Sequence, residues 1–239
     1  MKNVSVYILT TVCAVTLMFS IASCGGGDSH PLKGTWLGYW YVFDEITVTF
    51  DNQGNISEFL RDGSPLTGFT GGRAESLGQG TYLLAIQVDE DLANGWFLMD
   101  SIERHALFVL DVEGTYLPAA LEKGGENMPV YGLSDILGTW SGYSWAYSDT
   151  VMDMAEEAPR SLVATASLPD NNYTLTMPWG WILSGNFDTV FTQVAFYGGS
   201  GTGDWEIRST MSADKQFIGV VAEGGEFDDP AFFALTREP

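Results

Sequence analysis

The sequence has few of the residues on which catalysis and metal binding most often depend. Its 239 residues include two cysteines and two histidines. Cys13 lies inside an apolar N-terminal run that Cys24 ends, so a chain cleaved between them has no disulfide partner and no second thiol. His30 and His105 are the only histidines, which argues against a zinc site of the usual type. We expect His105, just before an apolar strand, to be a surface residue at a sheet edge.

Basic residues are also scarce. Ten Lys and Arg stand against 31 Asp and Glu, a formal net charge of −21. Such a surface repels phosphate backbones, which excludes nucleic acids as partners, and it repels anionic membrane surfaces. The acidity indicates solubility, with attraction of cationic ligands or divalent metal as the alternative. Neither a phosphate-binding loop nor the Gly-x-Ser-x-Gly motif of serine hydrolases occurs in the sequence. We therefore expect the protein to use no cofactor and to have no catalytic activity.

Long helical patterns are nearly missing, whereas glycines and aromatic residues are abundant. The 28 glycines, together with Asn and Asp, separate short apolar or alternating segments. This composition is typical of an all-β protein with many turns.

The N-terminal run ends in a short motif, Ile21-Ala22-Ser23-Cys24. It resembles the lipobox of bacterial lipoproteins, which implies a signal peptide over residues 1–23 and acylation of Cys24, by palmitate among other chains. The alternative is an uncleaved membrane helix, because the run is long enough to span a bilayer. Residues 24–31 then form a flexible Gly-rich tether. Gly25 stands where an Asp would imply inner-membrane retention, so the resemblance implies an outer-membrane anchor with the protein facing the periplasm.

One motif occurs twice: Gly34-Thr35-Trp36-Leu37-Gly38-Tyr39 returns as Gly138-Thr139-Trp140-Ser141-Gly142-Tyr143. Later residues match as well, with Trp96 aligned to Trp205 and Phe108 to Phe217. The sequence therefore predicts a tandem duplication, with one domain over residues 32–125 and another over residues 134–239.

The first copy predicts short strands in series without crossover helices. The segment from the first hairpin to Gly80 is Gly-rich and expected to be irregular. Clear strands are expected at residues 34–43, 45–50, 56–60, 82–88, 95–99, 106–112 and 116–122. Sequential antiparallel strands close most simply as an up-and-down meander barrel.

A Gly-x-Trp on the first strand and a basic residue on the last resemble the lipocalin-like, or calycin, barrels. The resemblance implies that Trp36 pairs with Lys123, and Trp140 with Arg237, as plugs that close one barrel end with a cation over the ring. It also implies ligand binding. Copies of about a hundred residues, however, favour a barrel filled by its own side chains.

Two groups of residues are candidates for a binding site. The aromatic side chains of Tyr143, Trp145, Trp179 and Trp181 suit a sugar ring or lipid chain, or else pack against the barrels. The acidic residues suit calcium, a solvated loop or, as a close pair, glycoside hydrolysis; they are Asp149, Asp153, Glu156, Glu157, Glu226, Asp228 and Asp229.

These patterns together predict a membrane-anchored envelope lipoprotein without catalytic activity. The first functional hypothesis is binding of a small apolar or amphipathic ligand, or of a glycan. The alternative is a structural or protein-interaction module that docks an envelope protein.

Overall fold

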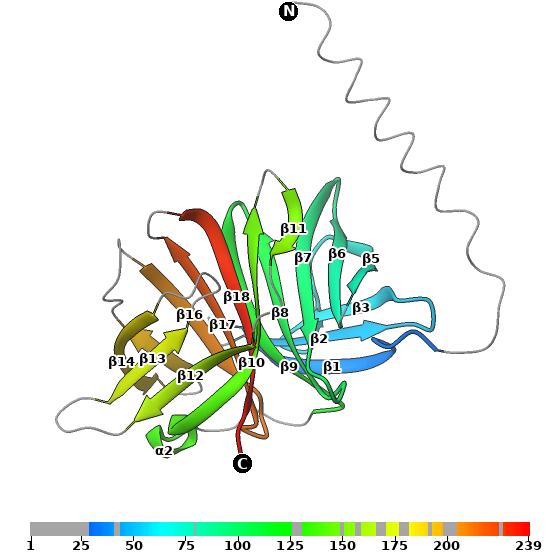
Figure 1. Cartoon of the computed structure of the whole chain (residues 1–239). Coiled ribbons are helices and arrows are strands. Elements are labelled where there is room, and N and C mark those ends of the chain that lie inside the picture. The colour runs from blue at the N-terminus through cyan, green and yellow to red at the C-terminus, as the bar shows by residue number, and fades with distance from the viewer. Residues whose placement is uncertain are drawn as a thin grey trace, which may run out of the picture.

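The protein is nearly all β, which confirms the predicted fold class (Figure 1). The computed structural model describes residues 29–40, 44–78, 80–125, 131–148, 151–155, 159–165, 171–176, 182–190, 193–197, 205–224 and 227–239. Two antiparallel sheets follow one another along the chain, and a short helical turn, α2 (Leu133–Ile136), precedes the second sheet. Within the described part of the chain, no helix has the length and apolar character needed to cross a membrane.

The first sheet is a closed barrel of eight strands. Each strand pairs antiparallel with the next along the chain, and the last returns to the first. The strands are β1 (Gly34–Trp40), β2 (Glu45–Phe50), β3 (Asn55–Arg61), β5 (Phe69–Gly78), β6 (Thr81–Val88), β7 (Asp91–Met99), β8 (His105–Val112) and β9 (Thr115–Lys123), with the short β4 (Ser64–Pro65) beside β3. This topology is the up-and-down meander that the sequence predicts.

Strand β5 corrects one expectation, because the Gly-rich segment is regular rather than irregular. It pairs with β6 along its length, and the register shifts near Gly71 and Gly78. Both glycines have positive φ, +150° and +101°, so they accommodate bulges that a side chain would oppose. Between them Ala74 is buried in the barrel core, and its neighbours Arg73 and Glu75 are exposed.

Aromatic rings fill the interior of this barrel. The rings of Trp36 and Phe50 each meet Phe97 edge to face, with centroids 5.0 and 5.4 Å apart, and Phe59 meets Phe108 at 5.8 Å. Such edge-to-face pairs are favourable beyond the area they bury. The barrel is thus packed by its own side chains, as its short length leads one to expect.

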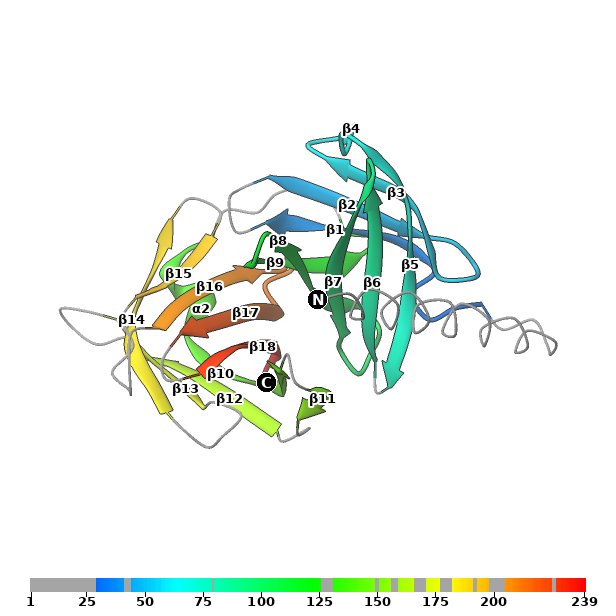
Figure 2. The same ribbon diagram turned by 90° about the horizontal axis from the view of Figure 1, so that it is seen from above.

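The second sheet follows the same meander order. It runs β15-β14-β13-β12-β10-β18-β17-β16, with β11 beside β10, and β15 approaches β16 (Figure 2). Its strands are β10 (Gly138–Ser148), β11 (Val151–Ala155), β12 (Pro159–Thr165), β13 (Asn172–Thr176), β14 (Ile182–Val190), β15 (Gln193–Tyr197), β16 (Trp205–Met211), β17 (Phe217–Gly224) and β18 (Phe227–Arg237).

The two sheets pack against each other through their outer faces. Strands β8 and β9 of the barrel contact β16 and β17, as Figure 2 shows near the centre of the molecule. The shared apolar cluster includes Trp96, Leu107, Phe217 and Phe232, and the rings of Trp96 and Phe232 lie 5.3 Å apart. Strand β8 is therefore buried on both faces, which explains the unbroken apolar run from Ala106 to Leu110.

The hydrogen-bond ladders also correct the internal alignment. The Asp100 N–H donates to the His105 carbonyl, and the Ser212 N–H donates in the same way to Phe217, both at the start of the last-but-one strand of their sheet. In these ladders His105 takes the place of Phe217, and Trp96 that of Arg208, so the predicted matches of Phe108 with Phe217 and of Trp96 with Trp205 are wrong.

Candidate functional site

The two tryptophans of the repeated motif lie at fully buried positions, each beside a cation. Trp36 stands opposite Lys123 in the β1–β9 ladder, and the Lys123 Nζ lies 5.2 Å from the indole centroid. Trp140 stands opposite Arg237 in the β10–β18 ladder, and the Arg237 Cζ lies 4.9 Å from its ring. Each indole N–H donates, at 2.8 Å, to the backbone carbonyl four residues earlier. Both rings are inaccessible to solvent, so they serve packing rather than ligand contact.

Most of the other candidates from the sequence fall outside the described residues. These are Cys24, Asp149, Glu156, Glu157, Trp179, Trp181 and Glu226, and also the side chains of Trp145, Asp153, Asp228 and Asp229, whose backbone lies in strands. Tyr143 is described: it lies on β10 and is 47% exposed. It belongs to a pocket that the sequence does not predict.

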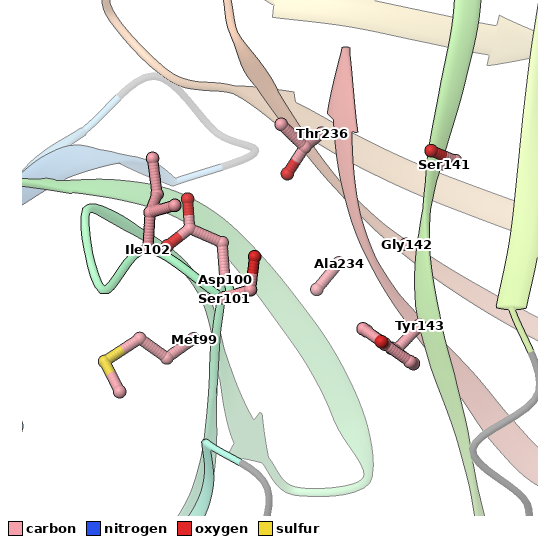
Figure 3. A pocket seen from close by; sticks show the side chains of 9 residues that line it. All are labelled: Met99, Asp100, Ser101, Ile102, Ser141, Gly142, Tyr143, Ala234 and Thr236. Carbon is pink, nitrogen blue, oxygen red and sulfur yellow. The ribbon is translucent and has the colours of Figure 1, made fainter. Parts of the chain in front are cut away.

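This pocket lies between the two sheets and has a volume of about 330 Å³ (Figure 3). One wall is the end of β7 and the turn after it, and the other is formed by neighbouring residues of β10 and β18. The lining residues are Met99, Asp100, Ser101, Ile102, Ser141, Gly142, Tyr143, Ala234 and Thr236. A volume of this order lies at the small end of the range for small-molecule sites.

The lining combines apolar groups with hydroxyls. Met99, Ile102 and Tyr143 present a thioether, an aliphatic chain and a phenol, while the hydroxyls come from one serine on each wall and from Thr236. Asp100 is the acidic member, and the residues that line the pocket include no Lys, Arg or His. The pocket therefore suits a neutral or cationic amphipathic molecule better than an anion.

Asp100 fixes the turn that forms the first wall. Its Oδ1 accepts the Arg104 backbone N–H at 2.9 Å, its Oδ2 lies 2.8 Å from His105 Nδ1, and its side chain is 4% exposed. Burial raises the pKa of Asp100, but the hydrogen bonds from His105 and from the turn outweigh burial and hold that pKa below its ordinary value.

His105 is buried, so its predicted place on the surface is wrong. Its side chain is 2% exposed because the second sheet covers the outer face of β8. Its Nε2 lies 3.0 Å from Asp214 Oδ2 in the turn between β16 and β17, and its ring stacks on Phe217 with centroids 5.6 Å apart and planes 8° apart. Burial lowers the pKa of His105, yet the hydrogen bonds and charges of Asp100 and Asp214 leave it above its ordinary value.

Arg104 and Glu122 complete what we call the interface ion network, which comprises Asp100, Arg104, His105, Glu122 and Asp214. Atoms of His105, Glu122 and Asp214 come within 4.8 Å of one another, a spacing also found around bound metal ions. The Arg104 Nη2, however, lies 2.8 Å from Glu122 Oε1 and 3.1 Å from Asp214 Oδ2, so a guanidinium supplies the cation between these carboxylates. We therefore describe the cluster as an ion network rather than a metal centre.

A second charged cluster joins the sheets elsewhere. Arg208 of β16 is 7% exposed and contacts Glu223 at 2.6 Å and Glu206 at 2.7 Å. It also donates to the Tyr116 carbonyl of β9 at 3.3 Å, and the Tyr116 N–H donates to Glu223 at 3.2 Å. Charged contacts thus accompany the apolar cluster that the two sheets share.

Comparisons with known proteins assign no family to the chain. No protein-family model matches it, and no curated protein matches it. Among solved structures, the chain is similar to a crystal structure of a protein of unknown function from the DUF3598 family of Nostoc punctiforme, with a TM-score of 0.38 and 11% identity over 87% of this chain and 97% of that chain.

Proposed function

We propose that this protein is a lipid-anchored, non-catalytic binding protein of the bacterial envelope that holds a small amphipathic ligand between its two sheets. The observation that carries the proposal is the pocket of about 330 Å³ with mixed apolar and hydroxyl lining. Because aromatic rings fill the barrel, the space between the sheets replaces the central chamber of a lipocalin as the ligand site.

The lining argues for an amphipathic ligand. A flat or aliphatic body packs on Met99, Ile102 and the Tyr143 ring, while hydroxyl or amine groups hydrogen-bond to Ser141 and Thr236. A sugar with one apolar face meets the same requirements as a lipid-like molecule with a polar head.

The titratable groups near the pocket favour binding over catalysis. A general base needs a lone pair within hydrogen-bond reach of the substrate. Both ring nitrogens of His105 are engaged by carboxylates, and both carboxylate oxygens of Asp100 accept hydrogen bonds inside the protein. These hydrogen bonds hold the wall of the pocket in place, and this structural role supports a binding function.

Attachment to the membrane is the second part of the proposal. The Cys24 motif supports an acyl anchor, an outer-membrane location and a periplasmic orientation, with the Gly-rich residues after it as a tether. Analysis of the N-terminal peptide by mass spectrometry tests this part by itself: we expect a diacylated or triacylated Cys24, and an uncleaved, unmodified N-terminus would contradict it.

The binding function is tested by mass spectrometry of an organic extract of protein purified from its native membrane. We expect a stoichiometric small molecule in addition to the acyl chains. Ser101→Trp places an indole in the pocket, and Ser57→Trp, at an exposed position on β3, is the matched control. Loss of the molecule from the Ser101 variant alone supports the pocket, and equal retention in both variants contradicts it.

A protein-interaction module is the second candidate. Ile102 and Tyr143 line opposite walls of the pocket and are 67% and 47% exposed, so apolar surface at the pocket is open to a docking partner. Extracts that contain acyl chains and nothing else, from protein that crosslinks to an envelope protein through these two residues, would favour this candidate.

A further inference from the structure

The interface ion network connects the two walls of the pocket through a single side chain. His105 Nδ1 lies 2.8 Å from Asp100, which belongs to the first wall. The ring of His105 stacks on Phe217, which stands opposite Thr236 in the β17–β18 ladder, and Thr236 belongs to the second wall. A change at His105 therefore acts on both walls.

The contacts of His105 fix its protonation state. An ionised carboxylate only accepts hydrogen bonds, whereas a neutral imidazole donates from one nitrogen alone. Because Asp100 and Asp214 face the two ring nitrogens at 2.8 and 3.0 Å, both contacts are hydrogen bonds only when the ring is an imidazolium that donates from both.

The other charged groups around the ring are consistent with this state. Glu122 stands opposite His105 in the β8–β9 ladder, and Arg104 pairs with Glu122 and Asp214. Lys215 pairs with Asp135, away from the ring, and the buried phenol of Tyr131 stays neutral because burial raises its pKa. Three carboxylates therefore stand against one guanidinium, and this excess of negative charge favours a second positive charge, on His105.

We propose that His105 is a proton-dependent clamp between the two sheets, closed when the imidazole is protonated and released when it is neutral, and that its state sets the width of the pocket. The clamp stands on the contacts above, whereas its effect on ligand binding rests on the proposed function.

Deprotonation of His105 breaks its hydrogen bond to Asp214 of the second sheet and not its hydrogen bond to Asp100 of the barrel. The Asp100 side chain is 4% exposed, and its Oδ2 accepts a hydrogen bond from His105 Nδ1. Because an unsatisfied buried carboxylate is costly, the neutral imidazole keeps its one proton on Nδ1, facing Asp100. Asp214 is 20% exposed and also has Arg104 and the Ser212 hydroxyl as partners. The His105 Nε2 lone pair then faces the Asp214 carboxylate at 3.0 Å, so His105 repels the turn that carries Asp214, and Arg104 is left to hold that turn to the barrel.

The sign of the effect follows from the same contacts. The pKa of His105 is raised, after the opposing effect of burial, by hydrogen bonds to Asp100 and Asp214. The clamp is therefore closed at and below the ordinary pKa of histidine and opens as the pH rises through the higher pKa of the folded protein. A periplasmic protein equilibrates with the surrounding medium, so such a clamp would report external alkalinity.

The first test is imidazole nitrogen NMR of the full chain in mild detergent, titrated from about pH 6 to about pH 9, across the range in which histidine changes charge. The chain has two histidines, and His30→Gln assigns the signals. We expect His105 to keep imidazolium shifts at a pH where His30, whose pKa burial lowers, is neutral. A neutral His105 at about pH 6 would overturn the proposal.

The second test is amide hydrogen exchange over residues 212–218, normalised to the hairpin of residues 59–66 in the same sample. We expect protection to fall several-fold as the pH rises through the titration of His105, because the contact between His105 and Asp214 is then lost. Asp214→Asn, which removes the charge and keeps the shape, should abolish this pH dependence; His30→Gln is the matched control and should retain it. Protection that does not respond to pH in the native chain overturns the clamp, even if His105→Gln proves unable to fold.

A third measurement separates the clamp from the ligand site. Nile red, a neutral apolar dye, is titrated at both ends of the pH range: pH-dependent affinity in the native chain, lost in Asp214→Asn, supports control of the pocket. If the dye does not bind but amide exchange still depends on pH, the proposed ligand function is contradicted and the clamp is supported. Stoichiometric binding of one equivalent of Zn²⁺ that removes the imidazolium signal would overturn the clamp and make the cluster a metal site.

Discussion

The pairing of Trp36 with Lys123 makes a prediction that a double-mutant cycle measures directly. Trp36→Leu leaves the Leu32 carbonyl, which is buried, without the donor that lies 2.8 Å away, at a cost of about 1–3 kcal/mol. It also removes ring volume from a fully buried site against Phe97, which adds to the cost of a cavity. We expect Trp36→Leu to lower the free energy of unfolding by about 3–5 kcal/mol.

Lys123→Met tests the cation alone. The Lys123 Nζ lies 5.2 Å from the indole centroid and also donates to the Pro31 carbonyl at 3.1 Å, so its loss should cost about 1 kcal/mol. If the cation acts through the ring, Lys123→Met costs less in the Trp36→Leu background, by a coupling energy of about 0.5–1 kcal/mol.

The assay is urea unfolding followed by far-ultraviolet circular dichroism, since the loss of a tryptophan changes fluorescence by itself. The same cycle with Trp140→Leu and Arg237→Met provides an internal comparison. The Arg237 guanidinium lies 4.9 Å from its ring and donates to the Leu137 carbonyl at 2.7 Å, so Arg237→Met should cost more than Lys123→Met. Additive costs in both cycles, with coupling below about 0.2 kcal/mol, would refute a role for the cation over the ring.

Two further predictions concern packing and pH. Gly38→Ala places its methyl carbon 2.0 Å from the Ala120 carbonyl oxygen, so β1 and β9 must separate. We expect this change to lower the free energy of unfolding, measured in urea, by about 3 kcal/mol. The control is Gly132→Ala, whose methyl carbon meets nothing closer than 3.7 Å and which should cost under about 1 kcal/mol. The free energy of unfolding should fall as the pH rises through the raised pKa of His105. It should also fall in acid as Asp214 becomes protonated, because hydrogen bonds hold the pKa of Asp214 low against the effect of burial. A stability curve that is flat above neutral pH in the native chain, as we expect for His105→Gln, would contradict the first part.

Local patterns in the sequence suffice for the fold class because each strand of a meander pairs with its neighbours in the chain. Alternating segments such as residues 45–50, bounded by Asn, Asp and Gly, identify the strands and turns without knowledge of distant contacts. The Gly-rich β5 was missed because bulges at Gly71 and Gly78 interrupt the alternation on which the prediction depends.

The site was beyond the same reasoning because it arises where two sheets meet. The pocket joins residues 99–102 to β10 and β18, which are adjacent only after both sheets have formed. For His105, one signal was present: the following residues are apolar on both faces of the strand, which indicates cover on both sides. Because a strand that is apolar on both faces is covered on both sides, a histidine at its start is expected to be buried and to have polar partners.

The charge balance of the chain gives the contacts between the sheets a common physical reason. With 31 acidic residues against ten basic ones, two sheets brought together by apolar burial alone would also bring their acidic groups together. The barrel contributes Arg104, whose guanidinium reaches Asp214 across the interface, and the second sheet contributes Arg208, which reaches the Tyr116 carbonyl in return. Each of these cations is also held by a carboxylate of its own sheet, and for Arg208, which is buried, that partner offsets the cost of burying a charge. An imidazolium at His105 adds a positive charge beside Arg104, and a physiological change of pH can remove that charge.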